Sequence, residues 1–343
     1  MRDSLIRKAN LMIIDKTYAE KLNRAKVDMG LSENPLGCSP MVLKALRNIS
    51  TKDLSVYPNQ TLFKQSVAKK FRVILPNIVL GGGSEQLIKL ICQTLLNKGD
   101  RVVIQRGSFA LFTKESLLAG SKVIFNDPRE MQKDLKVKLI FLCNPNNPTG
   151  EVITQDLIKI IVDKNKEAII VIDEAIGEFI DESFVIKAVK SDNCIVLKTL
   201  SKTFGLAGLR VGFCIGSRNI IRKLEFAQQP FPVSNLSLIG ASAALSDKNF
   251  IKRTKDFIAK ERKFLIKEIT LLNLKVSDSV TNNLFISCPG IIIERLTNSG
   301  VTVFPSSEFP GMKTSGFRIT IKDRKTNKLF IKKLQKAAAC LAK

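Results

Sequence analysis

The sequence contains no histidine and no tryptophan, and it has only two tyrosines. Without histidine the chain has no Ser-His-Asp or Cys-His catalytic group, and it lacks the commonest zinc ligand. Proton transfer must therefore rely on lysine, aspartate, glutamate, tyrosine or cysteine, or on a bound cofactor. No metal centre is expected.

Long apolar runs and paired cysteines are also missing. The apolar run near the N-terminus, Leu11 to Ile14, is too short for the core of a signal peptide, and no run approaches membrane-spanning length. The seven cysteines form no CxxC pair and mostly have apolar neighbours, as reduced buried thiols do. We therefore expect a cytoplasmic protein without membrane contact.

The charge balance is strongly basic, with 55 Lys and Arg against 31 Asp and Glu and a formal net charge of +24. One interpretation is a nucleic-acid-binding protein, because cations that neutralise phosphates mark such surfaces. The cations, however, are spread through helical patterns beside acids, as in 251–269, and aromatic residues make up only 6% of the chain. We favour a solvated basic surface and expect no nucleic-acid partner.

The hydrophobic pattern predicts an α/β fold in the first two thirds of the chain. Between about 75 and 216, short β-branched runs alternate with helical stretches, which is typical of a mostly parallel sheet covered on both faces. The predicted strands are 101–105, 122–125, 138–143, 168–173, 193–198 and 210–216.

The pattern changes after about Ser246. A long charged amphipathic helix comes first, short strands follow near 284–287, 301–304 and 316–321, and a helix from Lys325 closes the chain. At 343 residues the chain also exceeds the usual size of a single core. We predict a large α/β domain at 30–245 and a small α+β domain at 1–29 and 246–343.

In parallel α/β sheets, ligands bind beyond the carboxyl ends of the strands. Two segments there favour a ligand site. GGGSEQLIKLI (81–91) puts three glycines before a helix, whose free N–H groups can bind an anion, although Ser84 is equally well read as a plain N-cap. FLCNPNNPTG (141–150) adds three asparagines, Asn144, Asn146 and Asn147, that offer donors and acceptors where a turn needs only Pro and Gly.

Two further segments carry charge in apolar surroundings. VIDEAIGEF (171–179) places Asp173 and Glu174 at a strand end, where a carboxylate either pairs with a cation such as a ring nitrogen or caps the next helix. TLSKTFGLAGLRVGF (199–213) holds Lys202 in a largely apolar run. Such a setting disfavours the charged amine and frees it to attack a carbonyl. Arg210 would then be available to bind a phosphate.

These segments together resemble the pyridoxal-phosphate aminotransferases of fold type I, classes I and II. NPNNPTG, DEA and TLSKTFGLAGLRVGF stand in the family's order and at its separations, and LSENPLGCSP (31–40), VYPN (56–59) and FRIT (317–320) are similar to the histidinol-phosphate aminotransferase subgroup. The resemblance implies a large domain with a mostly parallel sheet that binds the cofactor, a smaller α+β domain, and a homodimer.

The resemblance also implies the roles of individual residues. Lys202 would bind the cofactor covalently and move the substrate proton, while Asp173 would pair with the ring nitrogen. Asn147 would contact the phenolic oxygen and Phe109 would stack on the ring. The remaining implied cofactor contacts are Gly83, Ser84, Glu85, Thr199, Ser201, Arg210 and, from the other subunit, Tyr57. Asn34 and Arg318 would bind substrate.

The implied reaction transfers an amino group between an amino acid or amine, such as histidinol phosphate or an aromatic amino acid, and a 2-oxo acid such as 2-oxoglutarate. The sequence departs from the family at Ile176, where Tyr is usual, at Phe109, and at Phe304, where histidinol-phosphate aminotransferases commonly have Arg. The segment 306–319 also resembles the threonine-phosphate decarboxylases of the same fold, so a lyase is the alternative; the TLSK form favours the aminotransferases.

Overall fold

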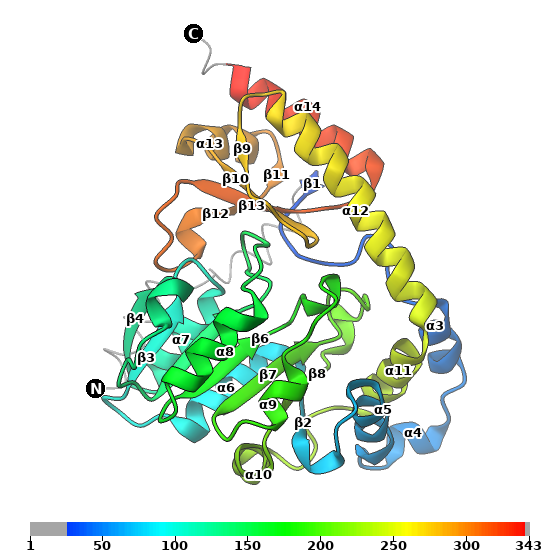
Figure 1. Ribbon diagram of the computed structural model, residues 1–343. Coiled ribbons are helices and arrows are strands. Elements are labelled where there is room, and N and C mark those ends of the chain that lie inside the picture. Colours follow the sequence, from blue (N-terminus) through cyan, green and yellow to red (C-terminus); the bar gives the residue numbers. More distant parts are fainter. Residues whose placement is uncertain (1–25, 340–343) are drawn as a thin grey trace.

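The computed structural model describes residues 26–339. It contains a seven-stranded sheet and a four-stranded sheet, each with its own helices, and the long helix α12 (Lys248–Thr270) runs beside both (Figure 1). None of the helices within 26–339 combines the length and the apolar character needed to cross a membrane.

The large sheet has the strand order β2-β8-β7-β6-β5-β3-β4. Strand β8 runs antiparallel to both of its neighbours, whereas β7, β6, β5, β3 and β4 are parallel in succession. The strands are β2 (Ile78–Gly81), β3 (Arg101–Gln105), β4 (Lys122–Asn126), β5 (Leu139–Cys143), β6 (Ile169–Asp173), β7 (Cys194–Thr199) and β8 (Gly212–Gly216).

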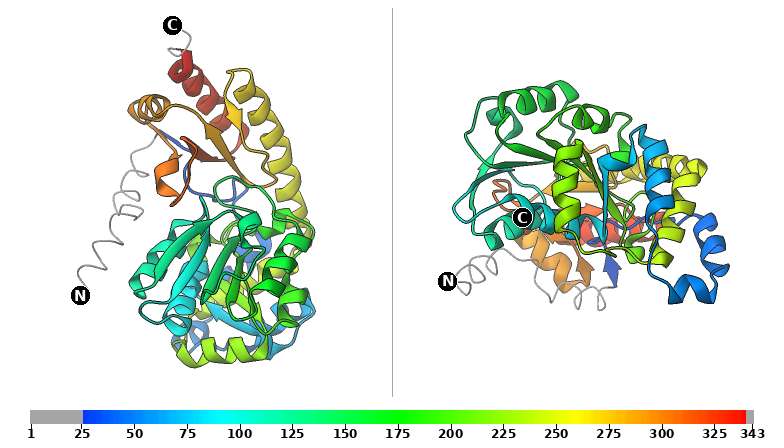
Figure 2. Two further views of the ribbon diagram at one scale, coloured as in Figure 1. Left: turned by 60° about the vertical axis from the view of Figure 1, so that its left-hand side comes forward. Right: turned by 90° about the horizontal axis from the view of Figure 1, so that it is seen from below.

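Helices cover both faces of this sheet (Figure 2). One buried cluster joins strand residues such as Ile140 to α3 (Pro40–Arg47), α5 (Thr61–Phe71), α8 (Gln155–Lys164), α9 (Val185–Val189) and α11 (Asn235–Ser246). A second joins alternate residues such as Phe141 to α6 (Gly83–Leu95), α7 (Ala110–Leu118) and α10 (Arg218–Ala227). Because each central strand is buried on both faces, its sequence is continuously apolar. The short α4 (Thr51–Ser55) contacts α11.

The second sheet is antiparallel, in the order β12-β13-β10-β9. Its strands are β9 (Lys275–Val276), β10 (Asn283–Ser287), β12 (Phe304–Pro305) and β13 (Gly316–Thr320). A parallel pair, β1 (Val27–Asp28) and β11 (Val301–Thr302), lies beside it. A third buried cluster packs these strands against α12, α13 (Gly290–Asn298) and α14 (Arg324–Ala338).

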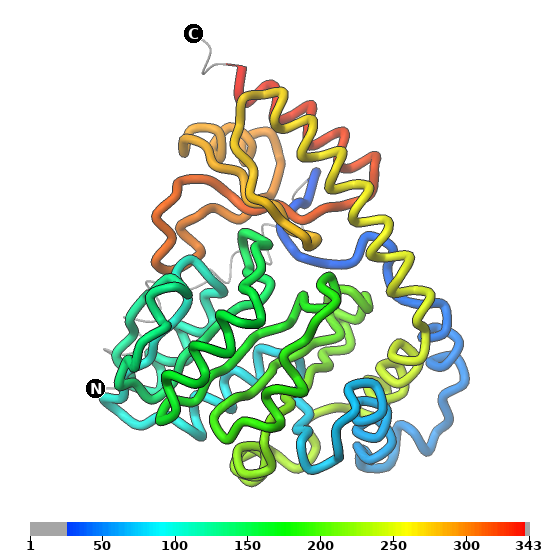
Figure 3. The backbone as a smooth tube through the Cα atoms, viewed as in Figure 1, coloured from blue at the N-terminus to red at the C-terminus, as the bar shows by residue number. Residues whose placement is uncertain are grey.

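Helix α12 connects the two parts. Its first turns pack Ile251 against the core of the large sheet, and from Ile258 onward its buried face joins the core of the small sheet. The backbone path in Figure 3 shows this helix extending from one part to the other. Within the described residues the two sheets thus have separate buried cores, and the division into 30–245 and 1–29 with 246–343 stays a prediction.

All six strands predicted for the large sheet are present, and each begins within two residues of its predicted start. Strand β2 was not predicted, because it has only four residues and ends at Gly81, the first of three glycines that were assigned to the following turn. The predicted strand 301–304 is two strands in different sheets: β11 pairs with β1, and β12 pairs with β13. The alternation of apolar and polar residues does not by itself show which strand each half of such a run pairs with.

Candidate active site

A cavity of about 500 Å³ lies where the two parts of the molecule meet. Ten of the residues predicted for the site line it: Ser84, Glu85, Phe109, Asn147, Asp173, Thr199, Ser201, Lys202, Arg210 and Arg318. The fold brings them together because Asp173 and Thr199 end the parallel strands β6 and β7, and the carboxyl ends of parallel strands lie at one edge of a sheet. Arg318 reaches the cavity from β13 of the small sheet.

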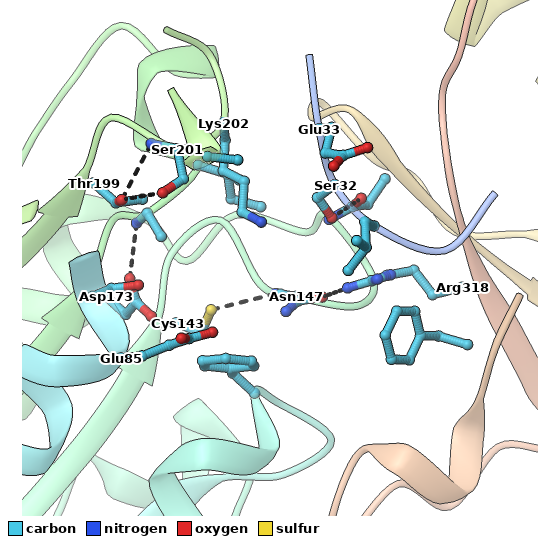
Figure 4. Close-up of a pocket in the computed structure, with 18 of the residues that line it drawn as sticks. Ser32, Glu33, Glu85, Cys143, Asn147, Asp173, Thr199, Ser201, Lys202 and Arg318 are labelled. Atoms are coloured by element: carbon cyan, nitrogen blue, oxygen red, sulfur yellow. Dashed lines mark hydrogen bonds between the residues drawn. The ribbon is translucent and has the colours of Figure 1, made fainter. Parts of the chain in front are cut away.

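The amine of Lys202 faces into this cavity (Figure 4). Within residues 26–339 its Nζ atom makes no hydrogen bond or ion pair. Burial, reinforced by Arg318 and Arg210, lowers the pKa of Lys202 to about 8, although Glu85 and Glu33 oppose the shift. An amine with so low a pKa is partly neutral near physiological pH and can act as a nucleophile.

Asp173 lies at the floor of the same cavity and is only 2% exposed. Burial, with a contribution from the neighbouring Glu174, raises its pKa to about 7, against the opposing effects of the Ala175 N–H and the lysines. The Ala175 N–H donates to Oδ1 at 2.8 Å. A buried carboxyl of this kind gains a favourable partner when a cationic ring nitrogen comes within reach.

The start of α6 gives the cavity a surface with the free N–H groups of a helix N-terminus, which can bind an anion. Gly83 has φ +84°, and a Cβ atom there would come within 2.9 Å of Nη2 of Arg210, so glycine suits both the backbone and the close approach of the guanidinium. Arg210 itself has a left-handed backbone conformation, φ 51°. Its Nη2 donates to Glu85 at 3.0 Å. Because this pair is half exposed, an incoming phosphate can compete for the arginine.

The hydroxyl groups of Thr199 and Ser201 lie beside this surface, with their oxygens 2.9 Å apart. The Oγ1 atom of Thr199 also accepts the N–H of Ser201 at 3.2 Å and donates to the carbonyl of Val211 at 3.1 Å. These bonds hold both hydroxyls in place before any ligand arrives.

Arg318 connects the two parts of the molecule across the cavity. Its Nη1 donates to Oδ1 of Asn147 at 2.7 Å, and its Nη2 donates to the carbonyl of Gly30 at 2.5 Å. The guanidinium lies over the ring of Phe304, 4.3 Å from the ring centre. Its position is therefore fixed by hydrogen bonds on one side and a cation–π contact on the other, which suits bidentate recognition of a carboxylate or phosphate.

Three predicted residues do not line the cavity. Gly83 lies against the guanidinium of Arg210 and affects the shape of the cavity only through that side chain. The amide of Asn34 is used by the protein itself: Nδ2 donates to the Thr203 carbonyl at 2.8 Å and to Oγ1 of Thr254 at 3.1 Å. This amide therefore connects the loop that carries Lys202 to α12, and the geometry gives no support to the predicted contact between Asn34 and the substrate. Tyr57 is 78% exposed and lines a different cavity.

Sequence reading missed several residues of the cavity wall: Leu31, Ser32, Glu33, Cys143 and Asn283. Ser32 donates to Oδ1 of Asn283 at 2.8 Å, a bond between residues 251 positions apart that no local pattern reveals. Residues 31–33 and Cys143 belong to segments that were singled out for their motifs. Ile176 and Phe304, noted as departures from the family pattern, are buried in the wall.

These features fit one cofactor, pyridoxal phosphate. Lys202 offers the amine for its aldehyde, Asp173 the partner for its ring nitrogen, Phe109 an aromatic wall, and Arg210 with Ser84 and Ser201 a place for its phosphate. When bound, the cofactor supplies an electron-withdrawing ring that stabilises negative charge on the substrate carbon. The protein's own residues would orient the substrate through Arg318 and move the proton through the Lys202 amine.

Comparison with known proteins agrees with this fit. Residues 24–334 match the model of the family described as aminotransferase class I and II. The histidinol-phosphate aminotransferase of Thermoanaerobacter pseudethanolicus is 35% identical over 328 residues, which cover 90% of this chain and 92% of that protein.

Two solved structures share the fold at 22% identity. The histidinol-phosphate aminotransferase of Sinorhizobium meliloti, in complex with pyridoxal-5'-phosphate, superposes with a TM-score of 0.87 and covers 97% of each chain. The L-threonine-O-3-phosphate decarboxylase of Porphyromonas gingivalis has a TM-score of 0.80, covering 92% of this chain and all of that one. The predicted fold type, with its mostly parallel sheet, is thereby confirmed. Because the family model matches most of the chain and a relative is 35% identical over nearly its whole length, this chain belongs to the pyridoxal-phosphate-dependent aminotransferases of classes I and II.

Proposed function

We propose that this aminotransferase moves an amino group from an amino acid or amine to a 2-oxo acid such as 2-oxoglutarate, with histidinol phosphate or an aromatic amino acid as donor. The observation that carries the proposal is the position of the Lys202 amine, free of hydrogen bonds within 26–339, in one cavity with the buried Asp173 and with Arg318. Similarity to relatives named histidinol-phosphate aminotransferase supports histidinol phosphate as a candidate.

The cations of the cavity support a substrate with one strongly bound anionic group. Lys202, Arg210 and Arg318 are the lysines and arginines among its lining residues. In our proposal the cofactor engages the first two, and Arg318 remains for the substrate's carboxylate or phosphate. Phe304 and Ile176 make the adjoining wall apolar.

A panel of amino donors with 2-oxoglutarate tests this proposal. Histidinol phosphate, phenylalanine, tyrosine and aspartate are compared by kcat/KM, with glutamate formation as the readout. Turnover of histidinol phosphate or an aromatic donor at least about tenfold above aspartate supports it. A preference for aspartate, which carries a second carboxylate, would contradict the single-anion interpretation.

A threonine-phosphate decarboxylase is the alternative, suggested by Ile176, Phe304 and the segment 306–319. Both residues line the cavity, so they are in a position to change the reaction. Release of carbon dioxide from threonine phosphate without a 2-oxo acid would favour this lyase. Glutamate-coupled turnover without carbon dioxide would exclude it as the main activity.

We also propose that the protein is a homodimer, because an exposed apolar surface surrounds Tyr57. Tyr57 and Leu62, 78% and 71% exposed, line a cavity of about 860 Å³ between α4, α5 and α11, and Leu54 on α4 is 64% exposed. Monomers seldom leave such residues grouped in contact with water. A partner covering this surface could bring its Tyr57 to the phosphate of the cofactor.

Replacing Tyr57 with phenylalanine is expected to raise the Kd for pyridoxal phosphate about tenfold and to leave the dimer intact, because one hydroxyl contact to a charged group contributes about 1.5–3 kcal/mol. Calorimetric titration gives the Kd, and light scattering gives the mass in solution. A monomeric wild-type protein, or unchanged affinity in the variant, would contradict this assignment.

We further propose a cytoplasmic protein that binds no nucleic acid. Its basic charge is offset in places by ion pairs such as Arg324 with the buried Glu261. A mobility shift with RNA or DNA that persists at moderate ionic strength would argue against this view.

The lowered pKa of Lys202 gives a pH prediction. Since the neutral amine attacks the cofactor's aldehyde, the rate of cofactor capture by apoprotein should rise about tenfold per unit of pH up to about 8 and then level off. Stopped-flow absorbance between pH 6 and 10 measures this rate. A rise that continues to pH 10 would show an amine with an ordinary pKa.

A further inference from the structure

A cluster of four charged side chains lies beside the ends of β6 and β7, with Lys198 and Glu174 buried and Glu178 and Lys70 partly exposed. Lys198 Nζ is 2.9 Å from Oε2 of Glu174 and 3.2 Å from Oε1 of Glu178. Lys70 approaches Glu178 at 3.7 Å, so the cluster holds two cations and two anions. The side chains of Lys198 and Glu174 are 4% and 0% exposed. The roles proposed above for the cavity residues use none of these groups.

The cluster is connected to Asp173 through the backbone. Asp173 pairs with Leu197 in the register of β6 and β7, and the Glu174 N–H donates to the Leu197 carbonyl at 2.8 Å. Glu174 and Lys198 each follow directly after this pair. Because side chains alternate along a strand, Glu174 points away from the cavity that Asp173 lines.

Glu174 is held firmly where it lies. Besides Lys198, it accepts the hydroxyl of Ser183 at 2.5 Å and the N–H of Phe184 at 2.8 Å. These contacts fix the segment that leaves β6, and with it the Ala175 N–H that orients the Asp173 carboxylate. Lys198 also lies over the ring of Phe71, 5.2 Å from its centre.

We propose that Lys198 is a positioning residue for Asp173: by binding and neutralising Glu174, it holds the end of β6 in place and keeps the Asp173 carboxylate ionised toward the cofactor's ring nitrogen. This inference rests on the cofactor-binding role proposed for Asp173. It assigns a function to a buried ion pair 24 residues apart in the sequence.

The charges that act on Asp173 have known signs. Glu174 raises its pKa, whereas Lys202 and Lys198 lower it. The thiols of Cys143 and Cys214 also lie near Asp173, but burial raises the pKa of each, so both are neutral. When the cofactor occupies Lys202, Lys198 is left to offset Glu174.

A purely structural role is the competing interpretation, in which the cluster only secures the segment after β6. Burying ions is costly, and apolar residues of similar volume often stabilise a fold as well or better. Stability therefore gives little reason for a buried lysine here. Control of the charge on Asp173 gives a specific reason for it.

The test compares four variants, Lys198→Met, Glu174→Gln, the double variant, and Lys198→Arg as the conservative control. Calorimetric titration of apoprotein with pyridoxal phosphate between pH 5.5 and 9 gives the pH at which affinity is half-maximal. Lys198→Met should move this midpoint up and Glu174→Gln down, each by about one unit for a nearby charge. The double variant and Lys198→Arg should lie near wild type, since neither changes the charge balance.

Opposite shifts that cancel in the double variant are the expected result, and a structural role would not produce them. Midpoints that stay fixed, or that move in the same direction in both single variants, would overturn the proposal, whatever happens to the melting temperature. If Lys198→Met does not fold, Glu174→Gln decides alone, because Lys198 keeps Glu178 as a partner.

The proposed role of Asp173 is tested separately by Asp173→Asn. If wild type and Asp173→Asn show the same pH profile of affinity, the role of Asp173 itself is wrong. If the two profiles differ but the Lys198 and Glu174 variants match wild type, only the inference about Lys198 is wrong.

Discussion

Replacing Lys202 with alanine is expected to lower kcat by at least about 10⁴-fold, because the variant loses both a covalent attachment and a general acid–base group, and the latter alone contributes about 10²–10⁴-fold. The structure shows no substitute among the described residues that line the cavity: they include no other lysine, and the chain has no histidine. The variant should still bind pyridoxal phosphate through Arg210 and Asp173.

Lys223→Ala is the matched control, since Lys223 is exposed on α10 and remote from the lining residues. It should retain wild-type kcat and the visible absorbance of the bound cofactor. Borohydride reduction of the wild-type protein, followed by peptide mapping, should place the label on Lys202. A label on another lysine, or a Lys202→Ala protein within tenfold of wild type, would reject the assignment.

Most of the large sheet could be predicted because burial on both faces leaves a simple trace in the sequence. The run 169–173 is apolar up to its last residue, and that residue, Asp173, stands at the edge where a ligand binds. A lysine in an apolar run was likewise conspicuous, and the structure places Lys202 in the same cavity as Asp173. Here the residues that stand out in the sequence are also residues that line the cavity.

Contacts made across long separations could not be predicted in this way. Lys198 was read only as the end of an apolar strand, yet it forms a buried ion pair with Glu174. Asn34 belongs to a motif that suggested substrate binding, but its amide bonds to Thr203 and Thr254. In both cases the partner is fixed by how strands and helices pack, and spacing in the sequence carries no information about it.

Phe304 shows what the structure adds to a prediction made from the sequence. The sequence showed an apolar residue where relatives commonly carry an arginine, and it predicted an effect on the substrate. The structure adds the reason why the position matters: the ring lies under the guanidinium of Arg318, 4.3 Å from ring centre to Cζ. Phe304 therefore affects both the charge of the wall and the orientation of the cation that remains for the substrate.

Asp173→Asn is expected to lower kcat by about 10²–10³-fold, a loss comparable to removing one preorganised electrostatic contact from an active site. Asparagine keeps the shape but cannot hold a proton on the cofactor's ring nitrogen, so the ring withdraws electrons less strongly. Steady-state kinetics at saturating cofactor measures the loss. Glu115→Gln, which removes a buried carboxyl from α7 outside the cavity lining, is the control and should keep kcat near wild type.

The same substitution should stabilise the apoprotein. The pKa of Asp173 is raised from 3.8 to about 7 in the folded chain, so the wild type has its full stability below about pH 4 and loses about 4 kcal/mol of it as the pH rises from there through 7. Asparagine does not ionise, so the melting temperature of the variant relative to wild type should rise by about 3 °C or more between pH 4 and pH 8. Scanning calorimetry at both values tests this difference.

Replacing a residue that is kept for structure would make the protein less stable. Replacing one whose buried charge serves the cofactor should lower the activity and raise the stability of the protein. A variant less stable than wild type at pH 8 would mean that Asp173 is kept for structure.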